Sequence, residues 1–273
     1  MSRLPISAIV VSKNEGALLE QCLSSIQFCE EIVLIDLQST DDTLEIAGRL
    51  ATECLTMEPV PLVEIIHEKY IPRLRHDWVL IIDPDEVCST ELQTELMRGF
   101  AAIQSSSGVG GVVVPHRFYF KAHLLLGTPC GGINAKILLA NKRRFLFTSH
   151  VHQGRTLAAG FAFHKIEFTG RNFVHHYWMQ SYSRLIEKHV RYLKNEGQAR
   201  FNCGRRTWLA EILKSPFREF KFSFQTKAGW RDGFTGLILS FFWAWYQTMA
   251  LIKLLHHQTT HQHRVKSSVI HAR

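Results

Sequence analysis

Three acidic side chains, Asp83, Asp85 and Glu86, fall within four positions directly after the apolar run at 78–82. Close like charges raise one another's pKa, so this cluster needs positive charge beside it. A bound Mg²⁺ or Mn²⁺ would supply that charge, because these ions take one or two carboxylates and fill their other positions with water and substrate phosphates. The Asp-x-Asp spacing therefore indicates a nucleotide diphosphate site, with a solvated acidic turn as the alternative.

The elements that must position these acids are short apolar runs rich in Val and Ile. Such runs are typical of strands covered on both faces, and they occur at 6–11, 32–36, 62–66 and 78–82. Helical patterns lie between most of them, which predicts an α/β fold with a mostly parallel, doubly wound sheet. Ligands of such sheets bind beyond the carboxyl ends of the strands. Asp36 and Asp83 each end a strand, so we expect both carboxylates in one crevice.

Three helix starts are predicted in this first half. The first lies near Asn14, and the second begins at Ser39, where Asp42 resembles the partner of a capping box. Ser89 is expected to cap a third helix. One face of that helix would carry Leu92, Leu96 and Phe100.

The second half of the chain reads differently. After a loop at 105–111, the stretches VVVPHRFYF, AKILLA and RRFLFT favour antiparallel strands. A helix is then predicted from 181, ending near Gly197, with its inward face made of Leu185, Ile186, His189, Val190 and Leu193. We expect a catalytic α/β region at 1–180, a helical region at 181–255 and a disordered His-rich tail at 256–273.

Composition and charge limit the class of protein. The chain has 273 residues and 46% hydrophobic content, enough for a full core. Its six cysteines lack any C-x-x-C pairing and no signal-peptide pattern opens the sequence, so we expect reduced cysteines and a cytoplasmic location. Residues 1–183 hold 16 Lys/Arg against 19 Asp/Glu, whereas 184–273 hold 16 against 5. The basic tail indicates an anionic partner.

Three ordered blocks, IVVSKNEGALLEQCLSSI, EEIVLIDLQSTDDTLEIA and DWVLIIDPDEVCS, resemble glycosyltransferase family 2 with the GT-A fold. Within it they are similar to the branch of lipopolysaccharide-core glucosyltransferases. The resemblance covers residues 5–100 closely and the second half more loosely. It implies an inverting, metal-dependent transfer of a sugar, such as a hexose, from a nucleotide diphosphate donor to a glycan or lipid-linked acceptor.

The resemblance also implies roles for single residues. Asp85 would be the main metal ligand, with Asp83 near the ribose or metal, and Glu86 would support the metal or the acceptor. The nucleotide pocket would be lined by Ser12, Asn14, Glu15, Asp36 and Ser39, with Lys136 as a phosphate contact. His152 and His176 fall where relatives place acceptor-side or metal-adjacent groups, although a structural histidine is the alternative for each.

One departure from the family bears on catalysis. Relatives read V-H-E where this chain reads HVHQG, so Gln153 stands in place of an acid on the acceptor side. Glutamine cannot accept the proton of an acceptor hydroxyl. Either Glu86 or another acid serves as the base, or the protein is an impaired nucleotide-sugar binder. Gln38 is a second departure, because it replaces a usual glycine in the loop after Asp36.

The C-terminal region contains twenty uncharged residues at 233–252, at the lower limit for crossing a bilayer. Four Lys/Arg precede this segment and four follow it, which favours a helix lying in the membrane surface over one that spans it. A buried core helix is the third possibility. Trp243, Trp245 and the basic, aromatic FREFKFSF suit an anionic membrane better than nucleic acid. We therefore expect peripheral attachment to the inner face of a membrane.

A phosphohydrolase is a competing class, because Asp-x-Asp also occurs as a nucleophile and acid pair. The threonine expected after the second aspartate is missing from DPDEV, which counts against that function.

Overall fold

The computed structural model describes residues 3–148 and 155–270, with side chains as far as residue 260. Its contacts divide the chain into two compact units. The first contains residues 1–117 and 133–177, and the second contains 118–132 and 178–273. The domain boundary predicted from the sequence, at residue 180, does not include the internal stretch 118–132 in the C-terminal unit.

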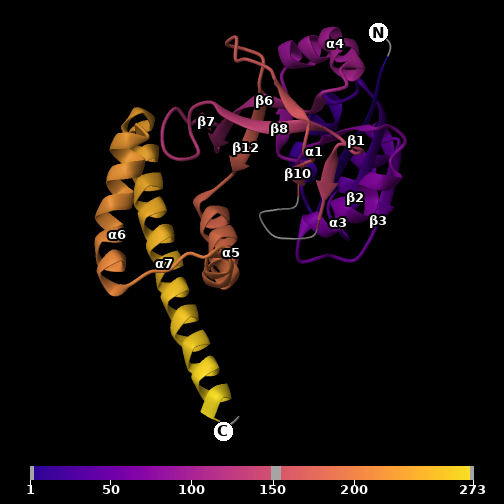
Figure 1. Ribbon diagram of the computed structural model, residues 1–273. Helices are drawn as coiled ribbons and strands as arrows, with labels where there is room; N and C mark the ends of the chain where they lie inside the picture. The colour runs from indigo at the N-terminus through magenta and orange to yellow at the C-terminus, as the bar shows by residue number, and fades with distance from the viewer. Residues whose placement is uncertain (1–2, 149–154, 271–273) are drawn as a thin grey trace. The chain divides into compact units, whose positions relative to one another are not determined.

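The first half of the sheet is parallel and carries the buried hydrophobic runs (Figure 1). Its strands lie in the order β3–β2–β1–β4, and their bounds are Glu53–Thr56, Cys29–Asp36, Leu4–Ser12 and Trp78–Ile81. β1 pairs with β2 and with β4, so its carboxyl end lies between the carboxyl ends of those two strands. The α/β fold expected from the sequence is confirmed.

The second half of the sheet is largely antiparallel, as its sequence indicates. β8 (Asn134–Asn141) pairs antiparallel with both β4 and β6 (Val109–Phe120), and β12 (Val174–Met179) pairs antiparallel with β5 (Glu86–Cys88). β6 also pairs with β7 (His123–Leu124) and, in parallel, with β11 (Ala162–Lys165). A separate hairpin joins β9 (Phe145–Phe147) to β10 (Arg155–Leu157). This arrangement places β5 and β12 side by side, which matters for the acidic cluster.

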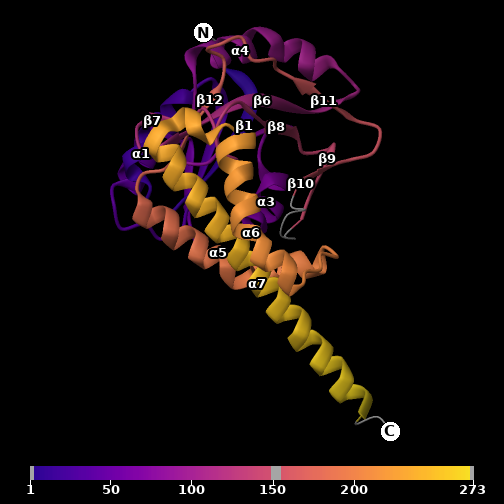
Figure 2. The same ribbon diagram turned by 90° about the vertical axis from the view of Figure 1, so that its left-hand side faces the viewer.

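Helices cover both faces of the sheet, and alternate residues of β1 show it. Ile6, Ala8 and Val10 belong to one apolar cluster, whereas Ile9 belongs to a second one. The first cluster includes side chains of α1 (Gly16–Ser25), α2 (Thr43–Leu50) and α4 (Thr90–Ser105); the second includes α3 (Val63–Tyr70) and the short η1 (Ile71–Arg73). Figure 2 shows α4 and α3 at opposite sides of the sheet. Burial on both faces explains why these strands are continuous apolar runs.

The predicted strand at 62–66 is wrong, because this stretch lies at the start of helix α3. The third parallel strand is instead β3, a short edge strand of sequence ECLT. A run of only five residues, four of them apolar, fits either element, and Ile66 and His67 are buried from a helix here. The sequence of β3 lacks an apolar run because an edge strand has only one strand neighbour.

The predicted capping box at Ser39 is also wrong. α2 begins at Thr43, and the carboxylate of Asp41 accepts from the backbone N–H of Thr43 at 3.1 Å and from that of Gly16 at 3.0 Å. One side chain therefore serves the first turns of α2 and α1. Desolvation raises the pKa of Asp41, but its hydrogen bonds from the Thr43 hydroxyl and from the two backbone N–H groups together outweigh that effect and lower this pKa. The cap at Ser89 is confirmed, since its Oγ accepts from the N–H of Leu92 at 3.2 Å.

The C-terminal unit is mainly helical. α5 (Tyr182–Asn202), α6 (Leu209–Lys221) and α7 (Gly233–Ile270) are its long helices, with the short turns η2 (Phe222–Thr226) and η3 (Gly229–Asp232) between the last two. α7 packs against both α5 and α6. The predicted helix over 181–197 is confirmed, but Gly197 does not end it, and Ile186 and Val190, predicted on its inward face, are exposed. A Cβ at Gly197 would lie 2.5 Å from the carbonyl oxygen of Lys253, so this glycine permits a close crossing of α5 and α7.

Among the described residues, one helical stretch, Gly229–Thr260, is long and apolar enough to cross a membrane by length and composition, with a mean hydropathy of 1.3. It contains the segment 233–252 noted in the sequence. α7 continues as far as Ile270, so helix extends into the tail for which the sequence analysis expects no regular structure.

Candidate active site

The carboxyl ends of β1 and β2 bring four of the predicted nucleotide residues together. Ser12 and Asp36 are neighbours across the two strands, and both side chains are buried. Both carboxylate oxygens of Asp36 lie 3.2 Å from the backbone N–H of Ser39. Among the described residues the Ser12 hydroxyl is buried without a hydrogen-bond partner in the protein. A buried hydroxyl in that state indicates a place where a ligand donor or acceptor is accommodated.

The loops that follow these strands are tied to each other. Asn14 has a φ of +55°, a left-handed conformation that asparagine tolerates better than most residues. Its backbone N–H donates to Ser39 Oγ at 2.9 Å, and its side-chain oxygen accepts from the N–H of Thr40 at 2.7 Å. Glu15 follows directly and precedes the first turn of α1. These contacts hold Asn14, Glu15 and Ser39 beside the Ser12–Asp36 pair.

The acidic cluster forms a closed turn after β4. The N–H of Glu86 donates to the carbonyl of Asp83 at 2.9 Å, and the N–H of Asp83 donates to Glu86 Oε2 at 3.2 Å. The turn is fixed to β12, because the N–H of Tyr177 donates to the carbonyl of Asp85 at 2.8 Å. Since β4 neighbours β1 in the parallel half-sheet, the turn emerges at the same edge as Ser12 and Asp36.

Glu86 is the buried centre of this turn. Its Oε1 lies 3.1 Å from Lys136 Nζ on β8 and 3.0 Å from His176 Nδ1 on β12. Burial opposes ionisation, but the hydrogen bond from His176 and the positive charge of Lys136 hold the pKa of Glu86 well below its ordinary value. Glu86 is therefore a carboxylate whose charge is matched inside the protein.

His176 links Glu86 to the second aspartate. Its Nε2 lies 3.5 Å from Asp85 Oδ2, while its Nδ1 contacts Glu86. Burial disfavours the imidazolium, yet the hydrogen bonds to Asp85 and Glu86 raise the pKa of His176 to about 9. A protonated ring that bonds one carboxylate through each nitrogen restricts the orientation of Asp85.

Asp83 differs from Glu86 in its surroundings. Its side chain reaches solvent, although protein atoms crowd the carboxylate. This crowding, with the negative charges of Glu86 and Asp85, raises the pKa of Asp83 to about 6 despite the opposing effect of His176. The turn thus contains two different carboxylates. The charge of Glu86 is matched by protein groups, whereas the charge of Asp83 is compensated poorly.

His116 is a member of the cluster that the sequence analysis missed. It is buried on β6, with Nδ1 donating to the carbonyl of Val114 at 3.1 Å and Nε2 3.8 Å from Glu86 Oε1. Burial lowers the pKa of His116 to about 4, so the ring is neutral near pH 7. A histidine in the otherwise apolar strand VVVPHRFYF is the signal that could have identified it.

The predicted residues thus divide into three sets. Ser12, Asn14, Asp36 and Ser39 gather at the ends of β1 and β2. Lys136 lies with His176 beside Glu86, and its role as a phosphate contact stays a prediction. His152 and Gln153 lie outside the described residues.

A divalent cation is compatible with the donor set at this edge, although the described residues contain no group of three or more His, Cys, Asp or Glu side chains arranged around one metal position. Asp83 and Asp85 supply two carboxylates, and the raised pKa of Asp83 reflects first its desolvation and then the negative charges of Glu86 and Asp85. Two carboxylates suit Mg²⁺ or Mn²⁺ when substrate phosphates and water provide the other ligands.

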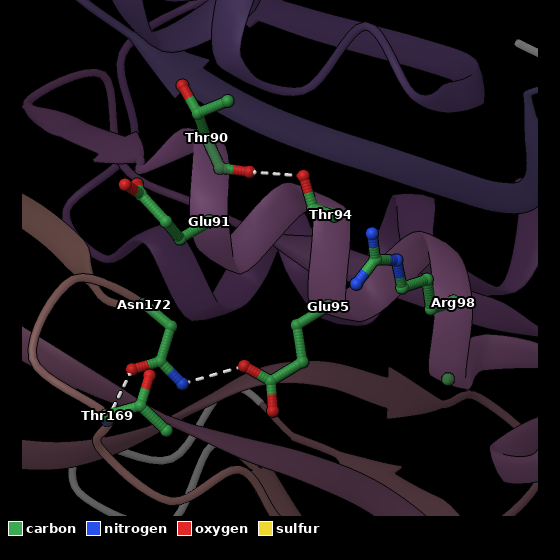
Figure 3. Close-up of a pocket in the computed structure, with 8 residues that line it drawn as sticks. Thr90, Glu91, Thr94, Glu95, Arg98, Thr169 and Asn172 are labelled. Carbon is green, nitrogen blue, oxygen red and sulfur yellow. Dashed lines mark hydrogen bonds between the residues drawn. The ribbon is translucent and has the colours of Figure 1, made fainter.

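A separate pocket of about 610 Å³ lies on α4 and contains none of the predicted site residues (Figure 3). Its polar groups largely bond one another: the Asn172 amide donates to Glu95 at 2.7 Å, and the Thr94 hydroxyl donates to the carbonyl of Thr90 at 2.8 Å. Its lining consists of Thr90, Glu91, Thr94, Glu95, Arg98, Gly99, Thr169 and Asn172. We assign no function to this pocket.

The curated proteins to which this chain is similar include several glycosyltransferases. No family model matches the chain. An uncharacterized glycosyltransferase of Rickettsia felis is 25% identical over 91% of this chain and 89% of its own length, and one of Rickettsia typhi is 24% identical over 91% and 86%. A shorter match, 46% over 41 residues, covers 15% of this chain and 15% of the lipopolysaccharide core biosynthesis glycosyltransferase LpsC of Rhizobium meliloti.

Among solved structures, the chain is similar to glucosyl-3-phosphoglycerate synthase from Mycobacterium tuberculosis in complex with Mn²⁺, UDP and glucosyl-3-phosphoglycerate. The identity is 21%, the TM-score is 0.34, and the match covers 42% of this chain and 44% of that one. The sequence relatives cover nearly the whole chain and bear out the resemblance seen in the three sequence blocks. The chain is therefore a homologue of bacterial glycosyltransferases.

Proposed function

We propose that this glycosyltransferase moves a sugar from a nucleotide diphosphate to a hydroxyl of a lipid-linked or lipopolysaccharide-type glycan, with inversion at the anomeric carbon. The supporting observation is that Ser12 and Asp36 leave the sheet at the same edge as Asp83 and Asp85, on three adjacent parallel strands. This edge is where open α/β sheets bind nucleotides. The match to LpsC, named for lipopolysaccharide core biosynthesis, supports the class of acceptor.

The nucleoside end of the donor would bind at β1 and β2. The buried Asp36 carboxylate can accept from the N–H of a base, and the unpartnered Ser12 hydroxyl can bond the same group. The hydrogen bond between Asn14 and Ser39 keeps the two loops in register, so the pocket is largely formed before the donor arrives. Glu15 would line the same pocket.

The diphosphate would lie at the acidic turn. Asp85 and Asp83 would hold Mg²⁺ or Mn²⁺, which when bound stabilises the negative charge of the leaving diphosphate. The protein's own part is to fix Asp85 through His176 and to fix the turn through the paired N–H groups of Asp83 and Glu86. Orientation of this kind reduces the reorganisation that the reaction requires.

We assign Glu86 a positioning role and not that of the base. Its carboxylate is buried, already bonded to Lys136 and His176, and held ionised. A general base must come within hydrogen-bond reach of the acceptor hydroxyl, and its pKa should lie near the working pH. The pKa of Glu86 is held well below that range and its Oε1 is already engaged, so we assign its charge to holding Lys136 and His176 in place.

The acceptor class also implies a location. A glycan carried on a lipid is reached at a membrane surface, and we place the protein at the cytoplasmic face as a peripheral protein. The basic composition of 184–273 supports attraction to anionic lipid.

Release of UDP or GDP from a panel of nucleotide sugars, with and without Mn²⁺, tests the proposal. We expect metal-dependent release from one donor, and a loss of roughly a hundred-fold or more for Asp85→Asn, because the metal contributes several kcal/mol to charge stabilisation. Asp77→Asn is a matched control, since Asp77 forms an ion pair with Arg143 near the surface and lies outside the site. That control should retain its rate within about two-fold.

A thermal-shift measurement with the same donors separates the alternative. A donor that raises the melting temperature but yields no nucleotide would identify an impaired nucleotide-sugar binder, which the glutamine at 153 would explain. Release that is unaffected by Asp85→Asn would contradict the proposed metal role.

A further inference from the structure

Helix α6 presents three distinct sides. Ile212 and Ser215 are buried, and Ser215 accepts a hydrogen bond from Thr248 of α7 at 3.0 Å. On another side Leu209, Leu213 and Phe217 recur every four residues and are 64%, 67% and 83% exposed. Three large apolar side chains in a row on the outside of a helix require an explanation, because a contiguous exposed apolar patch indicates a binding surface.

The third side of α6 is basic. Lys214, Arg218 and Lys221 are exposed and, at helical spacing, share a side next to the apolar row. The segment 205–231 contains seven Lys/Arg against two Asp/Glu. Both acids are engaged, since Glu211 accepts from the Thr207 hydroxyl and Glu219 accepts from Arg218. The surface around the apolar row is therefore strongly positive.

The apolar row continues onto α7. Phe220 packs against Phe241 of α7 with ring centroids 4.6 Å apart, and against Phe224 at 5.4 Å. We define the α6–α7 face as six of the exposed apolar side chains of these two helices, which lie side by side in Figures 1 and 2. Its members are Leu209, Leu213, Phe217, Phe234, Phe241 and Trp245. Phe234, Phe241 and Trp245 return to one side of α7 at helical spacing.

The same helices argue against α7 as a spanning segment. α7 packs along α5, and Arg200 of α5 pairs with Glu196 at 2.8 Å and donates to Gln247 of α7 at 2.9 Å. If α7 crossed a bilayer in this arrangement, these charged groups of α5 would enter the hydrocarbon. Ionised side chains there are costly. A one-sided contact leaves α5 in water and buries only the exposed apolar side.

We propose that the α6–α7 face lies in the surface of an anionic lipid bilayer, with α6 parallel to the membrane plane. The exposed apolar side chains would enter the acyl boundary while Lys214, Arg218 and Lys221 meet lipid phosphates, the arrangement of an interfacial amphipathic helix. This deepens the peripheral attachment proposed above and rests on it. The attachment element is then not the whole apolar segment 233–252 but the exposed side of α6 together with the exposed side of that segment.

Charge favours a bilayer over a second copy of the chain. A symmetric dimer through this face would bring the excess positive charge of 205–231 against itself. An anionic membrane is complementary to that charge, and each Lys or Arg near such a surface strengthens binding about five-fold.

Vesicle flotation with the full chain tests the proposal. We expect binding to vesicles of phosphatidylcholine with phosphatidylglycerol, weak binding to phosphatidylcholine alone, and release by alkaline carbonate. Leu213→Gln with Phe217→Gln should weaken binding roughly a hundred-fold, since burial of each large apolar side chain strengthens binding about ten-fold or more. Lys214→Glu with Lys221→Glu should weaken binding to the anionic vesicles by at least about ten-fold.

Matched variants elsewhere serve as controls. Leu146 is 60% exposed on β9, in the other unit, so Leu146→Gln should leave binding unchanged. Lys194 is exposed on α5, and Lys194→Glu makes the same kind of charge reversal once, outside the face. Far-ultraviolet circular dichroism confirms that each variant folds.

Three results would overturn the proposal. Equal binding of the α6 variants and their controls would remove the face from the interface. Resistance to carbonate extraction would indicate that α7 spans the bilayer. A dimer in sedimentation that Phe217→Gln dissociates, without vesicle binding by the parent chain, would assign the face to a second copy. Nucleotide release without vesicles reports on the donor site alone, so failure of the transferase proposal would be seen separately.

Discussion

The acidic turn and the α6–α7 face depart from ordinary residue placement in opposite ways. At the turn a carboxylate, Glu86, is buried among Lys136 and His176. On α6 the apolar side chains Leu213 and Phe217 are exposed. Proteins seldom bury charges unless they are paired, and extended apolar surface is seldom left in water without a partner.

The difference lies in where each departure is compensated. The charge of Glu86 is matched by groups of the same chain, so its contribution is to stability and to the shape of the site. The apolar row on α6 has no such match among the described residues, so its compensation must come from outside the protein. Substitutions at the turn should therefore change stability, and substitutions on the face should change only association.

Glu86→Gln is expected to have the largest effect. Glutamine keeps the shape but removes the charge that pairs Lys136 and His176, and breaking a buried ion pair costs about 3–5 kcal/mol. Urea denaturation followed by tryptophan fluorescence measures the loss. Glu167→Gln is the control, because Glu167 and Lys165 form an ion pair on the surface that is worth at most about 1 kcal/mol. Equal losses of stability in both variants would contradict the view that the charge of Glu86 stabilises the protein by pairing with Lys136 and His176.

A buried histidine on α3 offers a further test of how the protein compensates buried polar groups. His67 on α3 is buried, its Nδ1 has no protein partner among the described residues, and burial lowers the pKa of this histidine to about 3. The unfolded chain takes up a proton near pH 6.5 while the folded one does not, so stability falls as the pH drops below 6.5. Between pH 7 and pH 5 this amounts to about 2 kcal/mol.

The test is the variant His67→Leu, compared in urea at pH 7 and at pH 5. The loss of stability between these pH values should shrink by about 2 kcal/mol, because leucine does not titrate. His164→Leu, at an exposed histidine on β11, is the control and should leave the loss unchanged. An unchanged loss in His67→Leu would show that another group governs the acid sensitivity.

The sequence predicted well what depends on local pattern. The parallel strands with continuous apolar runs, the cap at Ser89 and the placement of Asp36 and Asp83 at one sheet edge all follow from periodicity and topology. The run at 62–66 was misread because its four apolar residues fit a strand or one side of a short helix equally well. Periodicity decides only over longer segments.

The partners of the acidic turn could not be predicted in the same way. Lys136, His116 and His176 come from β8, β6 and β12, which are distant in sequence and meet at Glu86 only through antiparallel pairing. The ion pair of Lys136 with Glu86 was not predicted, because family resemblance carries position but not contact. The exposed row on α6 was missed for a related reason, since which side of a helix is covered depends on its tertiary neighbours.

Gly197→Ala extends the comparison to a covered part of the helical unit. A Cβ at this position would lie 2.5 Å from the carbonyl oxygen of Lys253, so α5 and α7 must separate, at a cost of about 1–3 kcal/mol. Gly48→Ala on α2 is the matched control, because no atom lies within 4 Å of its Cβ. That control should gain about 0.5–1 kcal/mol from helix propensity. A loss of stability in both variants would contradict the close crossing of α5 and α7 at Gly197.

Phe217→Gln should have the smallest effect on stability, within about 0.5 kcal/mol, because this side chain is mostly in water before and after unfolding. Leu254→Ala on the covered side of α7 should cost about 2–5 kcal/mol in the same urea experiment. A loss of comparable size for Phe217→Gln would mean that part of the chain already covers this residue. In that case the apolar row would be internal structure like the Glu86 cluster, and there would be no reason to seek a membrane for it.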